Sequence, residues 1–261
     1  MELNATPSTA LTFGFILITL LLASWWIWLT GRAYANFFAE QTQKYSKTNT
    51  SRKATLWATV IILSWLGLTA MVSFQDWAHN FDSFPPPALR VLLILIAITM
   101  LFAFLKPGKV ISQQTPIWLL IGFQTFRVPL ELLIHQAYAE NITIIEMTYL
   151  GRNFDIVTGV LALLLAIYSY RHALSNWVIL LWNLLGLGLL LNVVATGIFS
   201  LPHPMQLVET NFPNVWITYF PFIWLPSLLV CSALFGHLLV FRYLTAQRKS
   251  PAVLNSQLNT D

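Results

Sequence analysis

Long apolar runs of about twenty residues are the feature that most constrains how this chain can fold. A helix rising 1.5 Å per residue needs about 20 residues to cross the hydrocarbon core of a bilayer. The chain is 57% hydrophobic and only 9% charged, well below the roughly 25% charge of soluble domains. We therefore predict an all-α polytopic protein of the lipid bilayer. Its seven transmembrane helices are expected approximately over 10–30, 55–74, 88–105, 116–139, 153–169, 177–199 and 215–241.

The spacing of these runs predicts a single membrane domain. No Gly/Ser linker or low-complexity tract interrupts residues 1–245, and the tail over 246–261 is expected to be cytoplasmic and disordered. The N-terminus has no basic n-region of a secretory signal, so the first run is expected to be retained. The one cysteine, Cys231, lies in an apolar run, which excludes a disulfide framework within the chain.

The distribution of Lys and Arg predicts the orientation of the helices. Eleven of the fourteen basic residues lie in the tail or in alternate connections, such as the segment from Arg32 to Lys53, which includes Lys44. The other connections are nearly free of them. Because cytoplasmic loops carry the excess of Lys and Arg, we expect the N-terminus outside and the C-terminus in the cytoplasm. The net charge of +4 therefore reports membrane orientation, and no nucleic-acid partner is expected.

A stripe of polar residues interrupts the apolar run over 116–139. At about 100° per residue, the side chains of Gln124, Arg127, Glu131 and His135 fall on one face of a helix. Charged residues at the centre of a membrane helix cost about 2.5–3.5 kcal/mol each, so the stripe must face partners or water. Pro129 lies within this stripe and, since it has no N–H for the carbonyl of Thr125, predicts a kink.

The start of the next run adds a second group of polar residues. Arg152, Asn153 and Asp155 are expected at the depth of His135, and Asn192 lies in the outer half of the following helix. One interpretation is an outward-facing pocket. The other is structural, with an i,i+4 ion pair between Arg127 and Glu131 and with Asn153 as a helix N-cap. The candidate pocket residues are Gln124, Arg127, Glu131, His135, Arg152, Asn153, Asp155 and Asn192.

Other kinds of site have little support in the sequence. His79, His135 and His203 are predicted at the outer side, but no HExxH motif and no His pair at i,i+4 accompany them, so no metal site is predicted. His172 and His237 are expected at the inner side, away from the candidate pocket. No P-loop, GxGxxG motif or nucleophile elbow occurs, and no cofactor is predicted.

Several blocks between about residues 80 and 245 resemble a family of uncharacterised bacterial multi-pass membrane proteins. These blocks read FPPPALRVLL, FRVPLELL, MTYLGRNFDIVTG, WNLLGLGLLLNVV, PNVW and YFPFIWLP, and a helical His237 follows them. The resemblance implies a bacterial inner-membrane protein and implies no activity. It places Arg127, Glu131, Asn153 and Asp155 inside recurring blocks, but not His135.

The sequence thus leaves three functions open. The first is a binding module whose polar pocket takes a small polar ligand or a lipid headgroup. The second is a membrane enzyme that uses Glu131 and Asp155 for acid–base chemistry, which requires both groups within hydrogen-bond reach of a proton. The third is a scaffold or assembly subunit with a purely structural ion-pair network.

Overall fold

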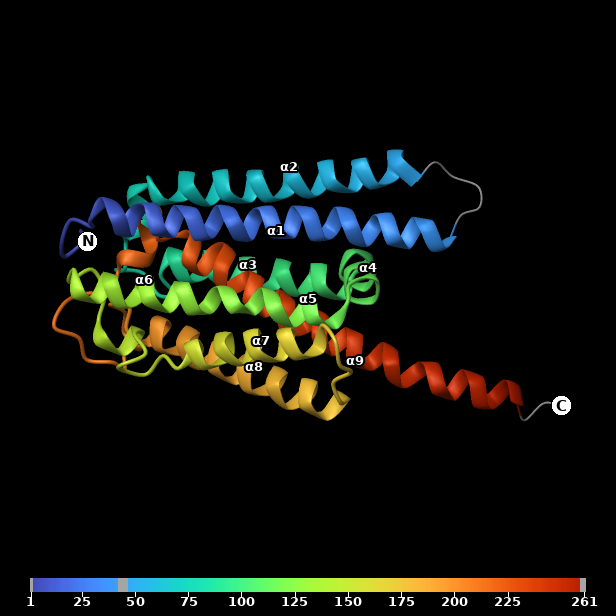
Figure 1. Cartoon of the computed structure of the whole chain (residues 1–261). Helices are drawn as coiled ribbons and strands as arrows, with labels where there is room; N and C mark the ends of the chain where they lie inside the picture. The colour runs from blue at the N-terminus through green and yellow to red at the C-terminus, as the bar shows by residue number, and fades with distance from the viewer. Residues whose placement is uncertain (1, 42–46, 259–261) are drawn as a thin grey trace.

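The structure, a computed structural model, describes residues 2–41 and 47–258, and this part of the chain is helical without a strand (Figure 1). Side chains over 41–50 and beyond residue 247 lie outside the description. The α-helices are α1 (Thr9–Gln41), α2 (Lys47–Ser73), α3 (Pro87–Phe104), α4 (Lys106–Gln114), α5 (Ile117–Gly122), α6 (Arg127–Ala139), α7 (Asp155–Ser169), α8 (Asn176–Phe199) and α9 (Cys231–Leu258). Short 3-10 helices are η1 (Asp76–His79), η2 (Phe123–Phe126), η3 (Ile145–Met147) and η4 (Trp216–Thr218), and η5 (Leu225–Val230) is a π-helix.

Six helical segments in the described chain are long and apolar enough to cross a membrane, which is typical of a multi-pass membrane protein. They cover Thr9–Glu40, Ser51–Ser73, Pro87–Phe104, Ile117–Ala139, Asn176–Phe199 and Leu225–Gln247. The remaining apolar helix, α7, has 15 residues and reaches about 22 Å, short of the roughly 30 Å of hydrocarbon. The all-α prediction is confirmed, and the bounds predicted for the third and sixth runs agree with α3 and α8.

The run predicted as one helix over 116–139 is divided into α5, η2 and α6. Pro129, in the first turn of α6, cannot donate to the carbonyl of Thr125, so regular i→i−4 bonding fails just before it. The N–H of Arg127 instead bonds the carbonyl of Gln124, three residues back. The predicted irregularity is therefore present, but as a 3-10 segment that begins the α6 helix at Arg127.

The prediction of a helix from residue 215 is wrong, because the last helical segment begins only at Leu225. Pro221 and Pro226 each remove a backbone donor from this stretch, and the π-helix η5 includes Pro226. The carbonyl of Ser227 accepts a hydrogen bond from the indole of Trp65 on α2, at 2.8 Å. The indole of Trp224 donates to the carbonyl of Leu66 at 3.2 Å. These two bonds fasten α2 to the irregular start of the last helix.

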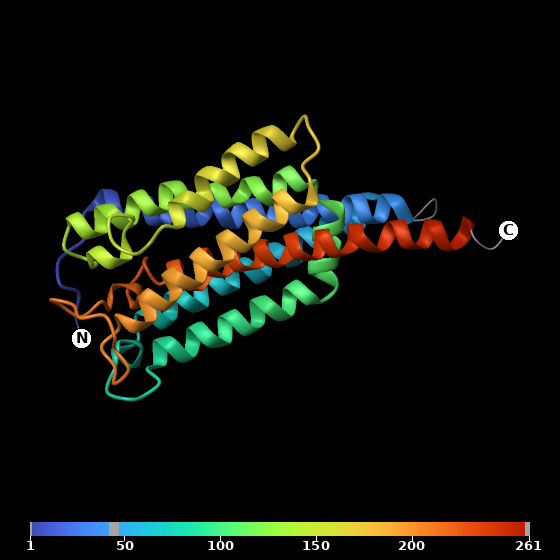
Figure 2. The ribbon, with the colours of Figure 1, turned by 90° about the horizontal axis from the view of Figure 1, so that it is seen from below.

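The helices lie along one common direction, with the two chain ends at opposite ends of the bundle (Figure 1). We call the end with residues 74–86, 140–154 and 200–215 the N-terminal end, and the end with α4 and residues 170–175 the C-terminal end. The α1 and α2 helices run side by side, and α3 packs mainly on α9 and α4. The short α4 helix crosses the long axis of the bundle at the C-terminal end, as Figure 2 shows.

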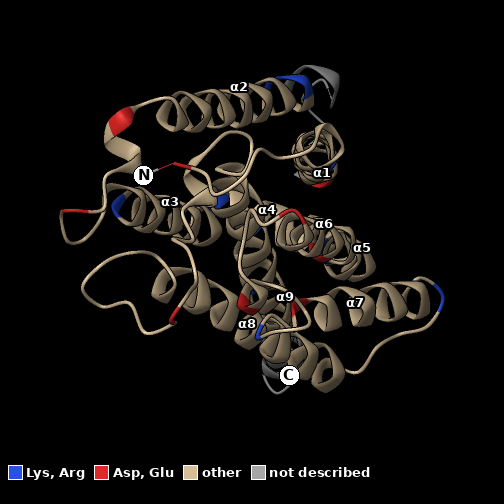
Figure 3. Ribbon diagram, turned by 90° about the vertical axis from the view of Figure 1, so that its left-hand side faces the viewer, with Lys and Arg blue, Asp and Glu red and all other residues tan. Residues whose placement is uncertain are grey.

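Figure 3 looks along the bundle from its N-terminal end and shows that Lys, Arg, Asp and Glu make up only a small part of the ribbon, in agreement with the 9% of charged residues. Hydrogen bonds also attach the start of α1 to the end of α6. The Ser8 hydroxyl accepts from the N–H of Leu11 at 3.1 Å and donates to Glu140 at 2.6 Å. Lys44, part of the basic segment that predicts orientation, and residues 259–261 of the predicted tail lie outside the described residues. The single domain over 1–245 and the disordered tail stay predictions.

Candidate functional site

The centre of the site is the guanidinium of Arg127, whose residue is 1% exposed. It forms an ion pair with the carboxylate of Asp155 on α7. Its Nε donates to Gln124 Oε1 at 3.0 Å and its Nη2 donates to His237 Nε2 at 3.0 Å. A longer bond of 3.4 Å reaches the carbonyl of Gly186. Each nitrogen of the guanidinium has a partner, and these partners lie on η2, α7, α8 and α9. Arg127 therefore ties α6 to α7, α8 and α9.

Glycines allow the helices to approach closely enough for these bonds. A Cβ built on Gly186 of α8 would lie 2.6 Å from His237 Cε1. A Cβ on Gly236 of α9 would lie 2.2 Å from the Phe123 ring and 2.9 Å from Gln124 Nε2. Small residues at such contacts are typical of helix packing in membranes. The positions next to the network therefore admit no side chain larger than hydrogen without movement of a neighbour.

His237 is a member of this network that the sequence analysis placed elsewhere. Since Arg127 donates to Nε2, that nitrogen accepts and Nδ1 carries the proton, which it donates to Asn183 Oδ1 at 2.8 Å. Asn183 Nδ2 returns a bond to the carbonyl of His237 at 3.1 Å. The prediction that His237 lies too far inward to join the site is wrong. A polar residue in each of two apolar runs, Asn183 and His237, was the available signal.

Glu131 lies on α6, one turn after Arg127, and is also 1% exposed. Asn153 Nδ2 lies 2.8 Å from each Glu131 carboxylate oxygen, and 3.0 Å from the carbonyl of Met147. The Oδ1 of the same Asn153 accepts from the N–H of Asp155 at 3.1 Å. Asn153 therefore connects the two acidic residues, through its amide to one and through a backbone bond to the other.

The formal charges of this network do not cancel. Arg127 is paired with Asp155 and not, as the structural interpretation predicted, with Glu131. Among the described residues, Glu131 has no cationic side chain within ion-pair distance. An isolated carboxylate is costly in an apolar interior, where it requires a proton or a cationic partner. One carboxylate is thus in excess over the single guanidinium.

Three of the candidate residues lie outside the network. His135 is half-buried beside Tyr149, with ring centroids 4.8 Å apart, and its Nδ1 has no partner among the described residues. Arg152 and Asn192 are exposed, and Asn192 donates to the Arg152 carbonyl at 2.6 Å. The eight candidate residues therefore do not all join one network. Gln124, Arg127, Glu131, Asn153 and Asp155 are brought together, with Asn183 and His237 added.

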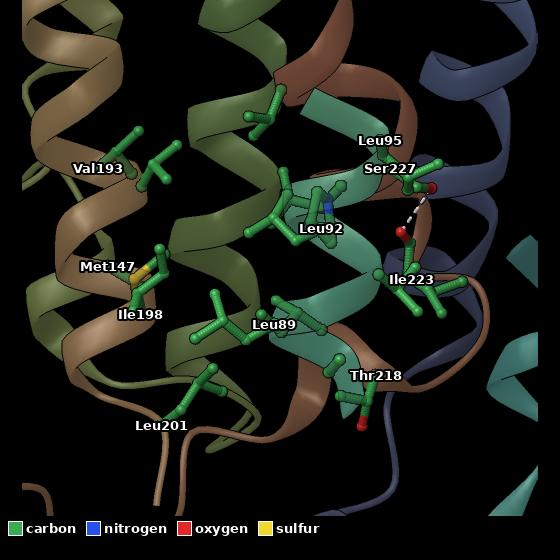
Figure 4. Close-up of a pocket in the computed structure, with 18 of the residues that line it drawn as sticks. Leu89, Leu92, Leu95, Met147, Val193, Ile198, Leu201, Thr218, Ile223 and Ser227 are labelled. Carbon is green, nitrogen blue, oxygen red and sulfur yellow. Dashed lines mark hydrogen bonds between the residues drawn. The ribbon is translucent and has the colours of Figure 1, made fainter. Parts of the chain in front are cut away.

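A cavity of about 100 Å³ adjoins the acidic side of the network. Glu131 and Asp155 line it, but most of its wall is apolar. Figure 4 shows Leu89, Leu92 and Leu95 of α3 on one side. Val193 and Ile198 of α8 lie on another side, with Leu201 just beyond the end of α8. The expected polar pocket is therefore an apolar cavity with carboxylates at one part of its wall.

The N-terminal end of the cavity is covered by η1 and η4, which contribute Ala78 and Thr218 to its lining. The ring of His79 joins these two elements, with Nδ1 2.9 Å from Thr218 Oγ1 and Nε2 3.1 Å from the carbonyl of Ser73. Burial lowers the pKa of His79, which favours its neutral form. Within the described residues, no group of three His, Cys, Asp or Glu side chains is arranged to hold a metal ion.

Fold and site together define a helical protein of the multi-pass membrane type with a buried Arg–Asp–His–Asn network beside an apolar cavity. The chain matches no protein-family model, no curated protein sequence and no solved structure. The resemblance to bacterial multi-pass membrane proteins therefore stays a prediction.

Proposed function

We propose that this chain is a seven-span protein of the bacterial inner membrane that binds a small amphipathic ligand beside Glu131. The ligand has an apolar body, which occupies the cavity between α3 and α8, and a cationic or hydrogen-bond-donating group, which meets the Glu131 carboxylate. The observation that carries this proposal is the unmatched carboxylate of Glu131 in the wall of an apolar cavity.

The seventh span is α7. It packs on α5 and α6, and α8 begins at the C-terminal end, so the chain must return there after α6. Residues 140–154, which precede α7, fold back at the N-terminal end. The basic side chains at the C-terminal end, such as Lys53, Lys109 and Arg171, support a cytoplasmic position for that end.

The chemistry of the ligand follows from the walls of the cavity. Leucine, isoleucine and valine side chains offer no hydrogen bonds, so they select an apolar body. A cationic head would balance the carboxylate of Glu131, and a charge-assisted hydrogen bond of this kind contributes about 1.5–3 kcal/mol. A free anionic group has no comparable partner, because Asp155 already occupies Arg127.

This proposal is favoured over the two other functions. A joint acid–base role needs two available carboxylates, and Asp155 is held in its ion pair with Arg127. A purely structural network would pair all of its charges internally, whereas Glu131 lines a cavity without a cationic partner among the described residues.

The experiment compares three probes of equal length, hexylammonium, hexanol and hexanoate, in thermal unfolding of the purified full chain in detergent. We expect hexylammonium to raise the unfolding temperature more than hexanol, and hexanoate to have the smallest effect. In Glu131→Gln the preference for the ammonium over the alcohol should disappear. The matched control is Glu209→Gln, which removes an exposed carboxylate outside the cavity lining and should retain the preference.

The same measurements can contradict the proposal. Equal responses of the wild-type protein to all three probes exclude recognition by charge. An ammonium preference that survives in Glu131→Gln assigns the binding to another acidic group or to the detergent micelle.

A further inference from the structure

A second cavity, separate from the one beside Glu131, lies toward the C-terminal end between α1, α2, α3 and α9. Its volume is about 250 Å³, larger than the roughly 150 Å³ of an engineered apolar cavity that binds benzene. Aromatic side chains dominate one part of the wall, including Trp57 and Trp65 of α2. Trp57 is 65% exposed, so this wall is open toward the lipid phase.

Lysines flank the cavity on two sides at its C-terminal end. Lys53 precedes the lining residue Ala54 and stands one helical turn before Trp57. Lys106 precedes the lining residue Pro107, and its Nζ lies 5.8 Å from the centre of the Phe37 ring on α1. Both lysines are exposed. The cavity therefore combines an apolar groove with two positive charges at one end.

Another cation at this end, Arg242, has a structural task. Arg242 Nη1 donates to the carbonyl of Ala103 and, at 3.2 Å, to that of Leu105. These bonds satisfy carbonyl groups at the end of α3. The guanidinium of Arg242 thus holds α3 in place, whereas Lys53 and Lys106 are exposed and form no ion pair within the described part of the chain.

We propose that this groove binds an anionic phospholipid of the adjacent leaflet. One acyl chain lies along Trp57 and Trp65, and the phosphate is held by Lys53 and Lys106. Basic pockets between membrane helices bind acidic headgroups, and each Lys or Arg near an anionic surface contributes about a fivefold gain in affinity. This site is independent of Glu131. A negative result for the phospholipid would therefore leave the proposed ligand site beside Glu131 unaffected.

The experiment titrates the delipidated full chain in detergent with two brominated phospholipids, phosphatidylglycerol and phosphatidylcholine. Bromine on the acyl chain quenches tryptophan fluorescence on contact. Of the eleven tryptophans, the exposed Trp57 reports the groove through the quenching that is lost on its replacement. The two headgroups report the charge. We expect phosphatidylglycerol to bind roughly tenfold to thirtyfold more tightly than phosphatidylcholine. In the double variant that combines Lys53→Gln and Lys106→Gln, the two lipids should bind with equal affinity.

Two further variants separate groove and charge. Trp57→Phe keeps the Trp65 bond to Ser227. It should lose the part of the quenching that comes from the groove while keeping the headgroup preference in native mass spectrometry. Arg171→Gln removes an exposed charge at the same end but outside this cavity and should behave as the wild type. Equal affinity of the wild type for both lipids overturns the proposal, as does quenching that is unchanged by loss of Trp57.

Discussion

Arg127 Nη2 donates to His237 Nε2 at 3.0 Å, and this bond joins α6 to α9 inside the bundle. It fixes the tautomer of a fully buried imidazole, which then donates from Nδ1 to Asn183 on α8. The orientation of one ring therefore depends on residues from three helices. A residue that can accept a hydrogen bond at the position of Nε2 is required here.

Replacement of His237 tests this requirement. His237→Ala leaves a donor of Arg127 without a partner, and we expect a loss of about 1–3 kcal/mol in the free energy of unfolding. His237→Gln keeps an acceptor and should recover at least half of that loss. Denaturant unfolding in mixed micelles measures both. Equal losses in the two variants would show that the packing of the ring, and not its accepted hydrogen bond, is what matters.

The ion pair of Arg127 with Asp155 can be tested by a double-mutant cycle. Arg127→Met leaves a buried carboxylate and Asp155→Leu leaves a buried guanidinium, and each should cost about 3–5 kcal/mol. The double variant removes both charges, so its loss should be smaller than the sum of the single losses by at least about 1 kcal/mol. Additive losses of stability would mean that the two side chains are not coupled.

The sequence predicts most of the helices but not the partners of the polar residues. Where an apolar run is uniform and has proline at or before its start, as in α3, the sequence alone indicates where the helix begins and ends. The bounds predicted for α3 agree with the structure. Residues 215–224 read as part of the last run because they are aromatic and apolar. Their prolines instead delay the last helical segment until Leu225.

That shift explains why His237 was misplaced. Counted from residue 215 it falls near the inner end of a span, but counted from Leu225 it lies about 18 Å into the helix. Periodicity alone did identify the face shared by Gln124, Arg127 and Glu131. It could not decide that Arg127 pairs with Asp155, because that choice depends on how α7 packs against α6.

The contact of Glu140 with Ser8 predicts a pH-dependent N-terminus. Burial raises the pKa of Glu140, but hydrogen bonds from the Ser8 hydroxyl and N–H and from Gln136 outweigh it, so the pKa is lowered. A lowered folded-state pKa gives stability that is complete above the unfolded value of about 4.3 and is lost as pH falls below it. Because the carboxylate is largely exposed, we expect less than about 1 kcal/mol.

Hydrogen exchange at the first turn of α1 measures this effect. Amides after Ser8 should exchange faster as the pH falls below about 4, once intrinsic exchange rates are corrected for pH. In Glu140→Gln they should exchange fast at every pH. The reference is Glu146→Gln, whose carboxylate forms no hydrogen bond to α1 among the described residues. Exchange in the wild type that is independent of pH would exclude a role for this carboxylate.

The proposed orientation predicts which residues reagents outside the cell can reach. Cys231 is the one natural thiol and is buried, so single introduced cysteines give a low background. We expect a membrane-impermeant maleimide to label Asp82→Cys in intact cells and Arg171→Cys only after lysis, since these exposed positions lie at opposite ends of the bundle. The reverse pattern would place the N-terminus in the cytoplasm. Labelling of both positions in intact cells would exclude α7 as a span.

The two acidic residues at the cavity should respond differently to loss of charge. Asp155→Asn breaks the ion pair with Arg127 and should cost about 3–5 kcal/mol of stability. Glu131→Gln removes the unmatched charge and keeps an oxygen that can accept from Asn153. The free energy of unfolding should therefore change by less than about 1 kcal/mol. Thermal unfolding of the two variants in the same detergent gives the comparison. Equal destabilisation would assign Glu131 to the structural network, because a carboxylate reserved for a ligand contributes little to the stability of the empty protein.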